Sequence, residues 1–225
     1  MIDAIIIVPE ITKGMKSVGS KSLLRIRKSK YILDYQIEQI YSISKKIRIH
    51  IATGFDNEKI KKAINKYNNV NICHNDKYEA TNYGRSLEIL IRSLPENSKG
   101  LFILCSGVLF KKQTLHHTNF KNNSKIFLLN KPKINFNIGC NQNTEDDYLF
   151  YDLPETWSEC VFLNKDAIKV LQQQIELQNI SQMYIFEIIN LLISKNVHFE
   201  KKYLSKGKFF KVNTIKDINK AKIFI

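Results

Sequence analysis

The sequence contains few of the residues that mark linkers, zinc sites and disulfide frameworks. Its 225 residues include only 4 prolines and 8 glycines, and no stretch rich in either divides the chain. A low-complexity or collagen-like protein is therefore excluded, and residues 1–225 are predicted to form one domain. The cysteines are Cys73, Cys105, Cys140 and Cys160. No two are spaced as Cys-x-x-Cys, so the sequence indicates neither a zinc site nor a thioredoxin-like site.

Long apolar runs are also missing. The opening segment MIDAIIIVPE has no basic residue before its apolar run, and that run is too short to span a bilayer. We therefore predict no membrane span and a reduced, cytoplasmic compartment.

Acidic residues are scarce beside basic ones. The chain has 21 Asp and Glu against 35 Lys and Arg, a formal net charge of +14 at pH 7. This balance favours anionic partners such as nucleotides, phosphorylated small molecules, nucleic acid or an acidic membrane surface. Because the lysines are dispersed from end to end, a lysine-rich composition bias is the alternative source of the charge. Nucleic acid is the weaker interpretation, since the sequence has no RNP-type, helix-turn-helix or zinc signature.

Apolar runs alternate with amphipathic segments along the first half of the chain. Short strands are predicted at Ala4–Val8, Ile47–Ala52, Val70–Cys73 and Leu101–Leu104. Helices are predicted over Ser29–Ile43, Asn57–Tyr67 and Ser86–Leu94. Strand–helix alternation at this spacing predicts an α/β fold with a mostly parallel central sheet and helices on both faces.

The second half is less regular. From Lys125 to Phe162 the sequence is irregular and strand-like. Helices are predicted near Lys165–Leu177 and Met183–Ile193, strands at His198–Tyr203 and Phe209–Val212, and a last helix capped by Thr214. The helix near Met183–Ile193 is apolar on most sides, so we expect it to be buried or to form a dimer contact.

A basic, glycine-bearing loop follows the first strand, in the segment VPEITKGMKSVGSKSLL. It contains Lys13, Gly14, Lys16, Gly19 and Lys21 between a buried strand and a helix, where nucleotide phosphates bind in open α/β sheets. Glycine lets the backbone approach a phosphate, and lysine neutralises its charge. The alternative is an ordinary basic, solvated loop.

The order of these segments resembles the nucleotidyltransferases that join NTPs to phosphorylated sugars or alcohols. The segment CHNDKYEATNYGRSLEIL most resembles the phosphocholine-type cytidylyltransferases. The resemblance implies a Rossmann-like nucleotidyltransferase fold, with residues 1–124 as the nucleotide-binding half and 125–225 as the acceptor-binding half. The implied partners are a nucleotide, CTP first, a small phosphorylated acceptor used in surface-glycan or lipid decoration, and either a second copy of the chain or a partner enzyme.

The resemblance also implies roles for particular residues. Two catalytic lysines would neutralise phosphate charge, namely Lys21 and Lys16. Further nucleotide-binding residues would be Lys13, Gly14, Asn82, Ser86 and Ser106.

Two departures from the family pattern fall at its metal site. After the strand LFIL the family presents an aspartate that binds Mg²⁺, and here that position is Ser106. The second metal aspartate, before the last helix, is Asn213. Because a hydroxyl and an amide lack the charge of two carboxylates, we assign no metal ligand, and the implied Mg²⁺ is in doubt. Two functions stay open: CMP transfer, or a catalytically inactive homologue that binds a nucleotide or a partner.

The sole tryptophan, Trp157 in LPETWSECVF, offers a possible face for a quaternary ammonium group. The interpretation we favour is an aromatic residue in the core or at a sheet edge.

Overall fold

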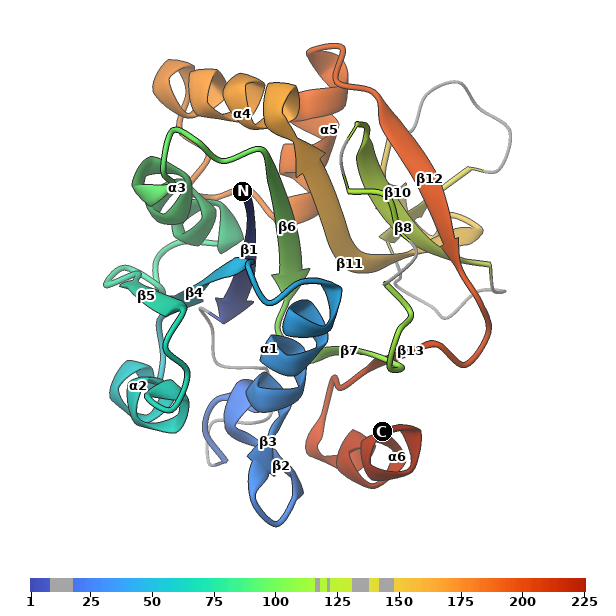
Figure 1. Cartoon of the computed structure of the whole chain (residues 1–225). Coiled ribbons are helices and arrows are strands. Elements are labelled where there is room, and N and C mark those ends of the chain that lie inside the picture. The colour runs from blue at the N-terminus through green and yellow to red at the C-terminus, as the bar shows by residue number, and fades with distance from the viewer. Residues whose placement is uncertain (9–17, 116–117, 121, 131–137, 142–147) are drawn as a thin grey trace.

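The computed structural model describes residues 1–8, 18–115, 118–120, 122–130, 138–141 and 148–225. Within these ranges, a nine-stranded sheet and two short two-stranded ribbons carry helices around them (Figure 1). The strands are β1 Ile2–Val8, β2 Arg25–Arg27, β3 Lys30–Tyr31, β4 Arg48–Thr53, β5 Val70–His74, β6 Gly100–Cys105, β7 Val108–Phe110, β8 Ser124–Asn130, β9 Ile138–Cys140, β10 Phe150–Tyr151, β11 Glu155–Asn164, β12 Phe199–Leu204 and β13 Phe209–Lys211. The α-helices are α1 Ile32–Ile43, α2 Asn57–Ile64, α3 Tyr83–Ser93, α4 Lys165–Leu177, α5 Ile185–Ser194 and α6 Ile218–Phe224, and the 3₁₀ helices are η1 Lys21–Leu23 and η2 Ile215–Asp217.

The first half of the chain forms a parallel sheet in the order β5-β4-β1-β6. Its central strand β1 is a run of buried apolar residues, and Ile6 pairs with Ile51 on one side and Leu104 on the other. Such a run suits a strand covered on both faces. The chain moves from β1 to β4 and β5, then returns past β1 to β6. Right-handed crossovers therefore place α1 and α2 on one face and α3 on the other, which confirms the predicted fold class.

The second half extends the sheet with antiparallel pairs. The ten-residue strand β11 pairs with β6 on one side and with β8 and β9 on the other, while β12 joins β8 in parallel. Within the segment predicted to be irregular and strand-like, a bulge shifts the β11–β8 register between Trp157 and Val161. Trp157 is buried there and its indole N–H donates to the Cys160 carbonyl at 2.9 Å, so the core interpretation of this residue is confirmed.

The helices follow the predicted order with shifted ends. α4 has the predicted bounds, α1 begins at Ile32 rather than Ser29, and α2 ends at Ile64 rather than Tyr67. The last helix begins as η2, where the Asp217 carboxylate accepts the backbone N–H of Thr214 at 2.9 Å. α5 packs against α3 and α4. Across the ranges that the structure describes, none of the helices combines the length and apolar character needed to cross a bilayer.

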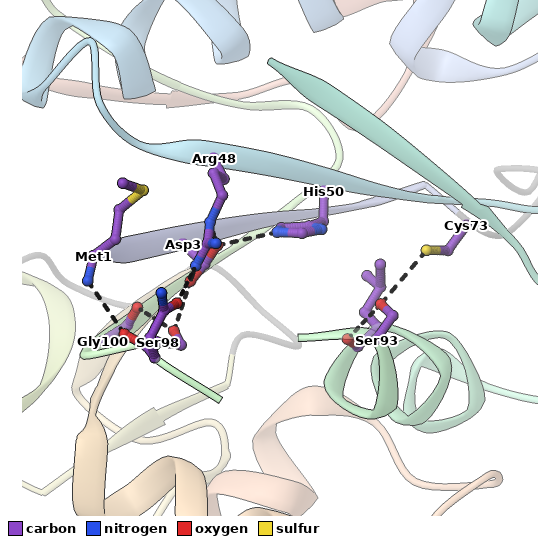
Figure 2. A network of polar contacts seen from close by, with 10 residues as sticks. Met1, Asp3, Arg48, His50, Cys73, Ser93, Ser98 and Gly100 are labelled. Carbon is purple, nitrogen blue, oxygen red and sulfur yellow. Dashed lines mark hydrogen bonds and ion pairs between the residues drawn. The ribbon is translucent and has the colours of Figure 1, made fainter. Parts of the chain in front are cut away.

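A buried ion cluster ties together the amino ends of the central strands (Figure 2). The Asp3 carboxylate is fully buried and accepts two hydrogen bonds from the Arg48 guanidinium, at 2.7 and 2.9 Å, and one from the Ser98 hydroxyl at 2.6 Å. His50 Nε2 lies 3.1 Å from the same carboxylate. Burial alone would raise the pKa of Asp3, but the hydrogen bonds with His50, Arg48 and Ser98 outweigh it and lower that pKa to about 2. The cluster lies at the end of the sheet opposite to the candidate site.

Candidate functional site

The turn after β6 lies beside the carboxyl end of β1, where ligands bind in open α/β sheets. The Ser106 N–H donates to the Ile7 carbonyl at 3.1 Å. From α1, the buried Gln36 amide donates to the carbonyls of Cys105 at 2.9 Å and Val108 at 3.1 Å. The turn of the segment LFILCSGVLF is thus held from β1 on one side and from α1 on the other.

Lys21 lies against this turn. It opens η1, and its Cε would be 2.9 Å from a Cβ built on Gly107. Gly107 has a φ of +84° and a Cβ there would also be 2.7 Å from the Val212 carbonyl oxygen, so only glycine fits. The neighbouring Ser22 hydroxyl is 2.9 Å from the Ser106 hydroxyl. The structure therefore brings together the predicted residues Lys21 and Ser106, which are 85 positions apart in the sequence.

Asn213 reaches the same turn through the β7–β13 ribbon. Lys211 pairs with Val108 in this ribbon, and the Val212 N–H donates to the Gly107 carbonyl at 2.9 Å. The two positions at which the resemblance expects metal aspartates, Ser106 and Asn213, each lie one residue from this hydrogen bond.

An ion pair that the sequence analysis missed lies next to these residues. Lys211 of β13 pairs with Glu159, which stands at the bulge of β11 with a φ of +56°. Both side chains are about one-quarter to one-third exposed, at 30% and 26%. Lys211 lies in the predicted strand Phe209–Val212, two residues before Asn213, but its partner was not apparent from the sequence.

The end of the predicted phosphate loop is anchored to the carboxyl end of β4. The Ser20 N–H donates to the Asp56 carboxylate at 2.8 Å, and Lys59 pairs with the same carboxylate at 2.7 Å. Gly19 has a φ of +90° and passes so close to Asp56 that a Cβ would be 2.7 Å from a carboxylate oxygen. The other predicted loop residues, Lys13, Gly14 and Lys16, lie outside the described residues, so their predicted roles stay predictions.

Asn82 and Ser86 lie at the start of α3, which follows the carboxyl end of β5. The Asn82 amide donates to the Gln182 carbonyl at 2.6 Å. The Ser86 hydroxyl is buried and accepts a hydrogen bond from the Asn75 amide at 3.1 Å. Both side chains therefore hold the segment between β5 and α3 in place, and their predicted contact with a nucleotide remains a prediction.

The described residues of the site do not fit a divalent cation. Mg²⁺ prefers charged oxygen ligands, whereas the turn and ribbon present a hydroxyl from Ser106, an amide from Asn213 and an ammonium group from Lys211. The nearby carboxylate of Glu159 is paired with that ammonium group. Within the described ranges, no cluster of three or more His, Cys, Asp or Glu side chains is arranged to hold a metal ion.

Comparison with solved structures identifies the fold as that of nucleotidyltransferases, as the order of segments predicted. The CTP:phosphocholine cytidylyltransferase from Streptococcus pneumoniae is 17% identical with a TM-score of 0.79, over 99% of this chain and 98% of that one. The inositol-1-phosphate CTP transferase from T. maritima is 13% identical with a TM-score of 0.73, over 100% and 94%.

A third structure, the 4-diphosphocytidyl-2C-methyl-D-erythritol synthase from Anaerococcus prevotii, is 16% identical with a TM-score of 0.68, over 100% of this chain and 95% of that one. At the level of sequence, no family model and no curated protein matches. The likeness is therefore one of fold, and it extends over nearly the whole chain.

Proposed function

We propose that the chain transfers a nucleotidyl group, CMP from CTP first, to a small phosphorylated acceptor. An acceptor phosphate oxygen forms a bond to the α-phosphorus, the bond from that phosphorus to the bridging oxygen of the β-phosphate breaks, and pyrophosphate leaves. The observation that carries the proposal is Lys21 placed against the Ser106–Gly107 turn at the β1–β6 edge. It supports the proposal because this fold is shared with two proteins whose names state transfer from CTP.

Nucleotidyl transfer requires the two reactants to be held in line and the phosphate charge to be neutralised, and it needs no covalent intermediate with the protein. The Lys21 ammonium group would stabilise the charge that develops on the α-phosphate and the leaving pyrophosphate. Lys16, Lys13 and Gly14 would cover the phosphates from the preceding loop. Ser106 would contact the nucleotide from the turn.

The acceptor would enter from the side of residues 125–225. A row of aromatic rings runs there, with Tyr83 next to Tyr184 at 6.3 Å between ring centroids, Tyr184 next to Phe186 at 6.1 Å, and Phe186 next to Tyr151 at 5.5 Å. Tyr184 and Tyr151 remain 43% and 56% exposed. Partly exposed rings of this kind favour an acceptor with an apolar or quaternary ammonium group. We also propose that the nucleotidylated product is used to decorate a surface glycan or lipid.

A second candidate function is a catalytically inactive homologue that binds a nucleotide or a partner. The replacement of charged metal ligands by Ser106 and Asn213 favours it. Fold likeness does not transmit chemistry when the groups that perform it are absent.

A pyrophosphate-release assay distinguishes the active transferase from the inactive homologue. The purified chain is incubated with CTP, UTP, ATP or GTP and with phosphocholine, inositol 1-phosphate or glucose 1-phosphate, in Mg²⁺ and in EDTA. We expect acceptor-dependent release with CTP, and a loss of at least 100-fold in Lys21→Ala. Lys169→Ala, which removes an equal charge from the exposed side of α4, should retain the wild-type rate. Nucleotide binding without release would identify the inactive homologue, and the absence of both would refute the site.

A further inference from the structure

The β7–β13 ribbon ends beside the Ser106–Gly107 turn, where the Val212 N–H donates to the Gly107 carbonyl. Leu109 and Val212 belong to a small core beneath one face of the ribbon. Lys211 points to the opposite face, which it shares with its cross-strand partner Val108 of the main core. Lys211 carries the only formal charge among the residues of β7 and β13.

Glu159 pairs with that charge. Its carboxylate pairs with Lys211 from the bulge of β11, across 52 positions of sequence. Both groups are only partly exposed, so water satisfies neither of them fully, and an anion that approached the ribbon would compete with Glu159 for the ammonium group. A left-handed φ at a residue other than glycine is a strained conformation that clusters at ligand sites.

We infer that Lys211 takes the place of a divalent cation, so that this site binds nucleotide phosphates without a metal, with Glu159 holding the ammonium group until the nucleotide arrives. The inference rests on the proposed function, because it concerns the same nucleotide site. An ammonium group supplies one positive charge and three hydrogen-bond donors. A divalent ion supplies two charges but prefers charged oxygen ligands, whereas Ser106 and Asn213 offer only neutral ones. Lys21, on the other side of the turn, supplies a second positive charge.

Calorimetric titration with CTP tests the inference, in EDTA and again in excess Mg²⁺. The wild-type dissociation constant should differ by less than about threefold between the two conditions. In EDTA, Lys211→Met should weaken binding at least tenfold, whereas Glu159→Gln should tighten it severalfold because the ammonium group loses its competitor. Lys169→Met on α4 removes the same charge at a distance and should bind as the wild type does.

Opposite effects of the two variants are the decisive readout. A merely structural ion pair would make both variants less stable and shift binding in the same direction. If Lys211→Met does not fold, the double variant Lys211→Met/Glu159→Gln, which leaves no unpaired charge, should show the same tenfold loss. Binding that needs Mg²⁺, or variants that bind alike, would overturn the inference while leaving the proposed function standing. No CTP binding under either condition would overturn both.

Discussion

Replacing Asp3 by asparagine should remove a large part of the stability that the buried ion cluster provides. In an unfolded chain an aspartate has a pKa of about 3.9. In the folded chain the pKa of Asp3 is about 2. The gap is close to 2 pKa units and each unit corresponds to about 1.4 kcal/mol, so the charged form stabilises the fold by about 2.5 kcal/mol. Asp3→Asn should cost about this amount at pH 7, because asparagine, like the protonated acid, offers Arg48 no negative charge.

The pH dependence of this loss follows from the sign of the shift. Because Asp3 has the lower pKa in the folded state, the folded chain binds fewer protons than the unfolded chain between about pH 2 and about pH 3.9. The free energy of unfolding therefore decreases as the pH is lowered. The contribution of Asp3 is fully present above about pH 5, falls to roughly half at pH 3, and is nearly gone at pH 2. The difference between wild type and Asp3→Asn should shrink accordingly.

Urea unfolding of both proteins at pH 7, 4 and 3 measures this difference. Asp166→Asn is the matched control, because that aspartate is 85% exposed on α4 and its loss should change stability by less than about 0.5 kcal/mol. The reasoning fails if Asp3→Asn is as stable as the wild type at pH 7. It also fails if the difference at pH 3 equals the difference at pH 7, since the cost would then come from packing and not from the charge.

Two further predictions concern the turn and the bulge. Gly107→Ala should lower the free energy of unfolding by about 2 kcal/mol or more, since the added Cβ would be 2.7 Å from the Val212 carbonyl at a left-handed φ. Gly207→Ala, with a φ of +76° but nothing within 4 Å, should cost only about 1 kcal/mol, and equal losses in urea unfolding would contradict the steric argument. Trp157→Phe should lower stability by about 1–2 kcal/mol, because the Cys160 carbonyl loses its buried donor. An unchanged thermal midpoint would show that this hydrogen bond contributes nothing.

Local patterns in the sequence were sufficient for the order of elements and for part of the site. The run of isoleucines in β1 and the helical spacing in α4 are short-range signals, because burial on two faces or on one stripe selects residues a few positions apart. The strand Leu101–Leu104 was correctly predicted, and Ser106 lies in the turn that follows it. Lys21 and Ser106 were both predicted as site residues, and the fold brings them to the same turn.

The bulge in β11 is a feature that local sequence patterns did not predict. Glu159 has a left-handed φ, and the β11–β8 register shifts between Trp157 and Val161, so a regular alternation does not run through the whole of β11. A bulge depends on the strands that pair with it, so it cannot be predicted from the residues of the bulged strand alone.

The sequence by itself therefore determined the α/β class and the order of most elements, and it singled out Lys21 and Ser106, which the fold brings to one turn. Only the tertiary structure decided that Lys211 meets Glu159 beside Ser106, and that Asp3 is buried among its hydrogen-bond partners. The physical reason is that the sequence specifies which side chains are charged but not which groups surround them. Those neighbours are determined by strand register and crossovers, which join residues about 50 positions or more apart. The strength of an ionic interaction depends on those neighbours and on burial, which no local pattern contains.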